Sequence, residues 1–210
     1  MLEKLPDALG QALHGQRAGL DKITFNKLSL RTGTAAIEVR SVAFADHAPI
    51  PADYTADGSG ASPPLSWTNV PSAAASLVLI VEDADAPTPQ PLVHAIAVDL
   101  PSGDGSLADA ALKGPKHAGA GLKAGLNSFM RAGWLPPDPP PGHGVHRYCF
   151  QVFALAKGPA FEGTPGRDAV QDALAERGIA SGMLIGTYER DTSVKVEDPA
   201  AALARKPVGR

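Results

Sequence analysis

Two short stretches of the chain hold the side chains best suited to chemistry. Residues 82–87 (Glu-Asp-Ala-Asp-Ala-Pro) place three acids directly after an apolar run, where carboxylates are costly unless they accept hydrogen bonds or meet cations. Residues 142–148 join a glycine-rich turn to His146 and Tyr148, and glycine lets backbone N–H groups approach a ligand closely. With His94, they indicate a site of carboxylates, imidazoles and a phenol. Purely structural roles also fit: a capped turn, and a hairpin entry with a hydrogen-bonded histidine.

Several kinds of chemistry can be weighed against these residues. A Ser-His-Asp triad would need an activated serine, and the chain has no G-x-S-x-G turn. Cys149 alternates away from His146 and Tyr148 on the predicted strand, which argues against a cysteine nucleophile. Asp83, His94 and His146 are metal ligands by type, but no compact spacing such as H-E-x-x-H occurs, so no metal is expected. Without a Walker loop or a G-x-G-x-x-G turn, no cofactor is expected; histidine and glycine N–H donors instead suit a small anion such as phosphate or carboxylate.

The composition excludes several classes of protein. Among 210 residues, Lys and Arg total 19 and Asp and Glu total 22, so a generally basic nucleic-acid binder is not expected. The single cysteine excludes an intrachain disulfide and a cysteine-based zinc site. No apolar run approaches the roughly 20 residues of a membrane span, so no integral membrane contact is expected. Residues 1–20 lack the apolar core of a secretory signal, which favours a cytoplasmic location.

The predicted elements are mostly strands. With 22 glycines and 20 prolines, the chain holds too many helix breakers for a helical bundle, so we expect a turn-rich, mainly β protein. Leu5, Leu9, Leu13 and Leu20 predict a short amphipathic helix that docks on its own core or serves a partner. A second helix is expected over residues 168–177, with Thr164 and Pro165 at its start. Strands are expected over residues 34–44, 77–81, 93–100, 145–155 and 183–188.

The order of the motifs resembles a known family. The run DADAP (83–87) resembles the D-P-D-x-P signature of phosphatidylethanolamine-binding proteins, and GVHRY (144–148) resembles their second signature, G-x-H-R followed by Tyr. The set is similar to the bacterial and archaeal Raf-kinase-inhibitor-like branch, and it extends over residues 42–190. Further matching segments are SPPLSW (62–67), the strand histidine His94, PPPGHG (139–144), FQVFAL (150–155) and GTYER (186–190).

The resemblance implies a fold and a division of the chain. The fold is an antiparallel β-sandwich, with a larger sheet packed on a smaller one and peripheral helices at the N- and C-terminal ends. Residues 1–40 would be an amphipathic extension, residues 41–191 the family domain, and residues 192–210 a tail.

The resemblance also implies a ligand site, with roles carried over position by position. Asp83 is the pocket carboxylate, Asp85 supports the loop, and His94 and His146 are imidazole donors with Tyr148 beside them. Ala84 replaces the usual proline of the first signature. Leu92 stands where many members carry a tryptophan at the rim of the pocket, and Trp134 would supply this aromatic wall instead. The remaining expected ligand-binding residues are Ala86, Pro87, Asp138, Pro139 and Pro140, of which Asp138 brings negative charge near the proposed anion.

Three functions remain open from the sequence. The resemblance favours binding of a small anion or a phosphorylated head group, in a regulatory or undefined role, with no assigned catalytic residue. An Asp/His/His pocket also suits acid–base isomerisation or hydrolysis. The third alternative is a protein-interaction module, and the resemblance allows a homodimer.

Overall fold

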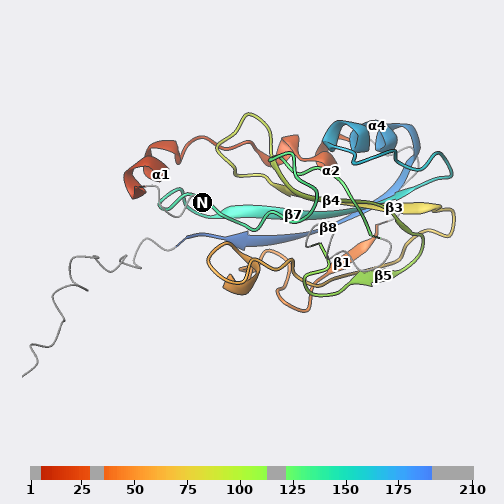
Figure 1. Ribbon diagram of the computed structural model, residues 1–210, viewed down its shortest axis with the longest axis horizontal. Coiled ribbons are helices and arrows are strands. Elements are labelled where there is room, and N and C mark those ends of the chain that lie inside the picture. Colours follow the sequence, from red (N-terminus) through yellow and green to blue (C-terminus); the bar gives the residue numbers. More distant parts are fainter. Residues whose placement is uncertain (1–5, 29–35, 113–121, 191–210) are drawn as a thin grey trace, which may run out of the picture.

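The protein is built in three layers, as the computed structural model in Figure 1 shows. The structure describes residues 6–28, 36–112 and 122–190. A larger β-sheet forms the middle layer, a smaller sheet covers one of its faces, and helices lie on the other. The predicted β-sandwich with peripheral helices is therefore confirmed.

Both sheets are antiparallel within the described part of the chain. The smaller sheet has the order β1-β2-β5 and contains β1 (Glu38–Arg40), β2 (Leu65–Thr68) and β5 (Gly105–Leu107). The larger sheet has the order β6-β4-β3-β7-β8 and contains β3 (Ser76–Asp83), β4 (Leu92–Pro101), β6 (Lys123–Ala124), β7 (His146–Leu155) and β8 (Gly178–Tyr188).

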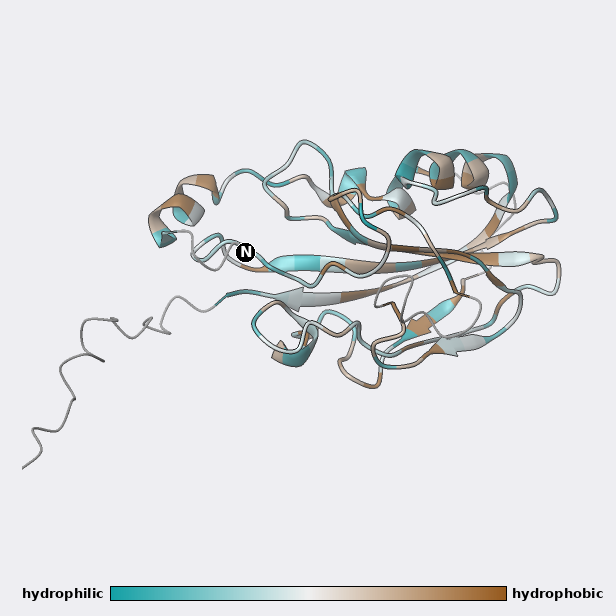
Figure 2. Cartoon of the chain, viewed as in Figure 1, coloured by the Kyte–Doolittle hydropathy of each residue, from teal (hydrophilic) through white to brown (hydrophobic). Residues whose placement is uncertain are grey.

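Strand β3 explains why an uninterrupted apolar run lies at the centre of the fold. Successive side chains of a strand point to opposite faces, and both faces of the larger sheet are covered. Leu77 and Leu79 face the core shared with the smaller sheet, whereas Val78 and Ile80 face the helix layer, and all four are fully buried. Figure 2 shows the most hydrophobic colouring along these central strands, with hydrophilic residues mainly in helices and loops.

The helix layer consists of short elements. They are α1 (Asp7–Leu13), α2 (Thr24–Lys27) and α4 (Arg167–Arg177), with a single 3-10 turn at Leu20–Lys22. Another 3-10 turn, Ala52–Tyr54, lies on the opposite side, where Tyr54 packs against the core shared with the smaller sheet. Val170 and Leu174 of α4 are buried against β3 and β7, so the helix is held by one apolar stripe. Within the described ranges, no helix is both long and apolar enough to cross a membrane.

The start of α4 differs from the prediction. We expected Thr164 and Pro165 to cap and open this helix, and that prediction is wrong. The helix begins at Arg167, and Gly166 occupies the capping position without a side-chain cap. Pro165 instead contributes its carbonyl oxygen to a hydrogen bond from the Leu126 N–H group, which holds it in a loop beside β6.

Candidate functional site

The candidate site lies where three strands of the larger sheet meet at one end. Strand β3 ends at Asp83, which pairs in register with Leu92 at the start of β4 and with Tyr148 near the start of β7. His94 is two residues into β4, and His146 opens β7. Antiparallel pairing thus gathers residues that are far apart in the sequence.

A chain of hydrogen bonds runs outward from Asp83. Its Oδ2 atom lies 2.8 Å from Nδ1 of His146, and Nε2 of His146 lies 2.6 Å from Nδ1 of His143. Nε2 of His143 then contacts the carbonyl oxygens of Leu13 and Gln16 at 2.9 and 3.2 Å. Asp83 and the two histidine rings of this chain are buried in the protein, and both histidines are at most 1% exposed.

Hydrogen-bonding rules fix the protons along this chain. Carbonyl oxygens only accept, so Nε2 of His143 carries hydrogen, and in the neutral ring its Nδ1 accepts from His146. His146 therefore donates through Nε2, and one further proton must lie between its Nδ1 and Asp83. Both nitrogens of His146 are thus engaged by protein groups, and a direct bond to a ligand would require one of them to be released.

Asp85 is held by two arginines rather than facing an open space. The Arg147 guanidinium makes two hydrogen bonds to its carboxylate, both 2.7 Å, and the Arg147 backbone N–H donates a third. Arg17 adds an ion pair at 3.0 Å. Burial opposes the charged form, but the hydrogen bonds from Arg147 and Arg17 outweigh it and lower the pKa of Asp85 below its usual value. This geometry fits the supporting role that the motif suggested.

The third part of the site surrounds His94. Nδ1 of His94 lies 2.6 Å from the carbonyl oxygen of Leu135. The Tyr148 ring packs edge-on against it at 5.1 Å between centroids, and the Trp134 ring lies 6.1 Å away. Nε2 of His94, the Tyr148 hydroxyl and the Trp134 indole nitrogen are all buried without a hydrogen-bond partner. Buried polar groups are usually paired, so three unpaired ones around one ring mark a place for a polar ligand.

The N-terminal segment, residues 6–19, packs over this end of the sheet. Helix α1 is seated by Gly10, where any Cβ atom would overlap the carbonyl group of Pro141. Arg17 then donates to the carbonyl oxygens of Val145 and His143. The predicted docking of the helix on its own sandwich is thus seen for the described residues. Helix α1 itself makes the contact through Gly10, whereas Leu9 is 43% exposed and Leu5 lies outside the described residues. Leu20 lies beyond the end of α1 and packs against the cluster that contains Ala84 and Cys149.

Comparison with known proteins identifies the fold and its motifs. A family model described as phosphatidylethanolamine-binding protein matches residues 40–189. The chain belongs to the phosphatidylethanolamine-binding protein family. A UPF0098 protein of Aquifex aeolicus is 37% identical over 174 residues, which are 82% of this chain and 99% of that relative.

Two solved structures of phosphatidylethanolamine-binding proteins are also similar. A homologue from Chlamydia trachomatis is 36% identical and superposes with a TM-score of 0.67, covering 75% of this chain and 100% of its own. E. coli YbcL, described as a member of the mammalian family, is 27% identical with the same TM-score, covering 74% of this chain and 99% of its own. The family resemblance inferred from the motifs is confirmed.

The remaining residues expected from the phosphatidylethanolamine-binding motifs lie around the same end of the sheet. The carbonyl oxygen of Ala86 accepts from the Ala18 N–H group, and Pro87 is partly buried next to it. Pro139 and Pro140 are buried, and their carbonyl oxygens accept from Arg190 and from the His143 N–H group. Asp138 lies 2.8 Å from Arg190 in an ion pair. That cation offsets part of the negative charge that the sequence placed beside the site.

The motifs of the phosphatidylethanolamine-binding family did not single out every residue that builds this site. His143 was visible within the glycine-rich turn but was assigned no role, although it anchors the N-terminal segment. Trp134 was considered only as an aromatic wall, whereas its buried N–H group adds an unpaired donor. Arg17 lies outside the family match and had no sequence signal, because its partner Asp85 is distant in the chain.

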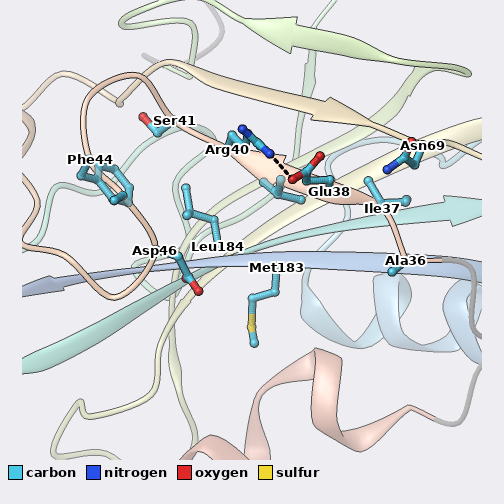
Figure 3. A pocket seen from close by; sticks show the side chains of 12 residues that line it. Ala36, Ile37, Glu38, Arg40, Ser41, Phe44, Asp46, Asn69, Met183 and Leu184 are labelled. Carbon is cyan, nitrogen blue, oxygen red and sulfur yellow. Dashed lines mark hydrogen bonds and ion pairs between the residues drawn. The ribbon is translucent and has the colours of Figure 1, made fainter.

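A hollow of about 710 Å³ lies elsewhere, between β1 and β8 (Figure 3). It is lined by Phe44 and Leu184 and by the paired side chains of Arg40 and Glu38. None of the described residues that line it has a buried side-chain polar atom without a partner. The unpaired groups around His94 therefore make that site the stronger candidate.

Acidification is expected to loosen the N-terminal segment. Burial, together with the nearby His146 and Arg17, lowers the pKa of His143 below 6.5 despite its two carbonyl partners. A base with a lowered pKa contributes stability above pH 6.5, and this stability is lost as pH falls from 6.5 through the lowered pKa. A protonated His143 would also turn a second N–H group toward His146.

Hydrogen exchange measures this loosening at two amides. Ala18 and Gly19 donate to the carbonyl oxygens of Ala86 and Ala84, so their protection reports docking. After correction for intrinsic rates, we expect weaker protection at pH 5.5 than at pH 7.5. The buried Ile80 amide in β3 is the internal control. Equal protection of Ala18 and Gly19 at both pH values would contradict the prediction.

Proposed function

We propose that this protein binds a small oxyanion or a phosphorylated head group at the end of the larger sheet. The observation that carries the proposal is the set of three buried, unpaired polar atoms on His94, Tyr148 and Trp134. The indole and phenol are hydrogen donors, and burial together with Asp83 and Asp138 raises the pKa of Tyr148 well above 10, so its hydroxyl stays neutral. Two neutral donors suit the oxygen atoms of a phosphate or a carboxylate.

Asp83, His146 and His143 act as positioning residues in this proposal. Their hydrogen-bonded chain holds the end of β3 against the start of β7, directly beside Tyr148. Because both nitrogens of His146 already have partners, this histidine is less suited to move a substrate proton. The geometry of His146 therefore supports a positioning role over acid–base catalysis. A homodimer and a cytoplasmic location stay predictions.

Replacing Tyr148 by phenylalanine tests the proposal. The hydroxyl has no partner in the free protein, so its removal should leave the unfolding temperature unchanged or raise it. A hydrogen bond to a charged ligand is worth about 1.5–3 kcal/mol, so affinity for phosphate or phosphoethanolamine should fall roughly 10- to 150-fold. Calorimetric titration and thermal unfolding of the same sample measure both quantities.

Tyr54→Phe is the matched control for this experiment. Tyr54 lies beside two acids, Asp53 and Asp109, that would repel an anion, so losing its hydroxyl should leave anion affinity unchanged. Wild-type affinity in Tyr148→Phe would refute the assigned site. Failure of the unaltered protein to bind either anion would refute the proposed function itself.

A further inference from the structure

The two nitrogens of His94 have unequal roles. Nδ1 lies 2.6 Å from the Leu135 carbonyl oxygen, which can only accept, so the ring hydrogen is on Nδ1. In a neutral imidazole, Nε2 is then a bare acceptor. This Nε2 is the buried nitrogen without a partner, so the site presents an acceptor in addition to its two donors.

His94 is neutral at physiological pH. Burial, reinforced by His146, lowers its pKa below 6.5. Asp83, Asp138 and the Leu135 carbonyl act in the opposite direction but do not overcome the burial. A ligand that offers only acceptor atoms would therefore bring a lone pair against the lone pair of Nε2.

We propose that the site selects a ligand that donates a hydrogen to Nε2 of His94, as a phosphomonoester or an inorganic phosphate monoanion does through its own P–O–H group. This inference rests on the proposed function. The P–O–H group donates to Nε2 of His94, while other oxygens of the same phosphate accept from Tyr148 and Trp134. Sulfate has nearly the same shape but stays fully deprotonated near neutral pH, and a phosphodiester has no hydrogen on its phosphate.

A dianion has one other way to satisfy the site, which is to bind together with a proton on His94. That route becomes easier as the solution is acidified, because the histidine is protonated below its lowered pKa. The affinity for sulfate should therefore rise as the pH falls from 7 to 5.5, and the ratio of phosphate affinity to sulfate affinity should decrease. An ammonium group on a head group is a separate source of a donor hydrogen.

The test is a calorimetric titration of the whole protein at pH 7 with four probes. They are inorganic phosphate, methyl phosphate, dimethyl phosphate and sulfate, and phosphoethanolamine is a fifth arm that adds an ammonium group. A site that must satisfy a buried acceptor rejects a ligand without the matching donor, so sulfate and dimethyl phosphate should bind at least roughly 10-fold more weakly than the monoesters. If phosphoethanolamine binds no more tightly than methyl phosphate, the hydrogen on the phosphate is sufficient to satisfy Nε2 of His94, and the ammonium group adds nothing.

Two variants separate this inference from general anion binding. His94→Phe removes the acceptor and should reduce phosphate affinity to that of sulfate, which abolishes the preference. Tyr148→Phe should weaken every oxyanion similarly and preserve the preference. Sulfate or dimethyl phosphate binding as tightly as phosphate in the unaltered protein would overturn the inference while leaving the proposed function intact, whereas no binding of any probe would overturn both.

Discussion

Replacement of Asp85 by alanine is expected to destabilise the protein by about 3 kcal/mol. Its carboxylate is fully buried and forms an ion pair with the Arg147 guanidinium, which donates two hydrogen bonds to it. Arg17 supplies a second cation from the N-terminal segment. Without Asp85, two positive groups would face each other and the Arg147 N–H group would lose its acceptor. The expected loss of stability lies at the lower end of the range for a broken buried ion pair, because both arginine side chains are partly exposed to solvent. Arg17 is 28% exposed and Arg147 is 36% exposed.

Urea unfolding of Asp85→Ala and Asp172→Ala measures this difference. Asp172 is an exposed acid on α4, and its removal should change the free energy of unfolding by less than about 0.5 kcal/mol. Equal unfolding midpoints for the two variants would mean that the pairing of Asp85 with its arginines contributes nothing to stability.

Replacement of Gly182 by alanine is expected to cost about 3 kcal/mol, because the new methyl group would overlap backbone. Gly182 lies in β8, and the position of its Cβ falls well inside contact distance of the Ile37 carbonyl group. The Ile37 N–H group donates to Ser181 at 2.9 Å, so the chain entering β1 cannot withdraw without losing this bond. The absence of a side chain thus permits the smaller sheet to approach the edge of the larger one.

Gly15→Ala is the matched control for Gly182→Ala. Apart from Gly15 itself and its two chain neighbours, no atom lies within 4 Å of the position where a Cβ at Gly15 would be placed, and this glycine does not have a positive φ. The same change should be neutral or slightly stabilising there, since alanine restricts the unfolded chain. Thermal unfolding of the two variants decides the matter, and an unchanged melting temperature for Gly182→Ala would show that β1 adjusts without cost.

The long strands could be predicted because their residues carry the signal themselves. The alternating run of β7 placed Tyr148 and Cys149 on opposite faces, and they do pack in separate clusters. The apolar sequence runs that form β3 and β4 predicted these strands equally well, although both strands extend beyond the predicted ends.

The short strands could not be predicted in this way. Strand β6 contains two residues and is defined by its pairing with β4 rather than by any pattern of its own. Similarly, the predicted strand over residues 34–44 contracts to β1 (Glu38–Arg40), because pairing with β2 covers only those residues; residues 34–35 lie outside the described part. β2 and β5 were missed for the same reason.

The candidate site shows a similar division between side-chain identity and orientation. The motifs placed Asp83, His94, His146 and Tyr148 together, and the structure brings them to one end of the sheet. Which ring nitrogen faces which partner depends on turn geometry that the motifs do not contain. The sequence therefore could not distinguish His146, with both nitrogens engaged, from His94, with one nitrogen unpaired.

The docking of Arg17 has a consequence for the order in which the protein is assembled. Its backbone partner Val145 is 128 residues further along the chain. During synthesis the N-terminal segment leaves the ribosome first and its partner Asp85 follows directly after β3, but Val145 emerges only after β3 and β4 are available to pair. Contacts of such wide separation form late because the loop they close costs entropy. The nascent chain therefore already contains Arg17 when Asp85 is made, but this buried carboxylate lacks its second arginine, Arg147, until β7 begins.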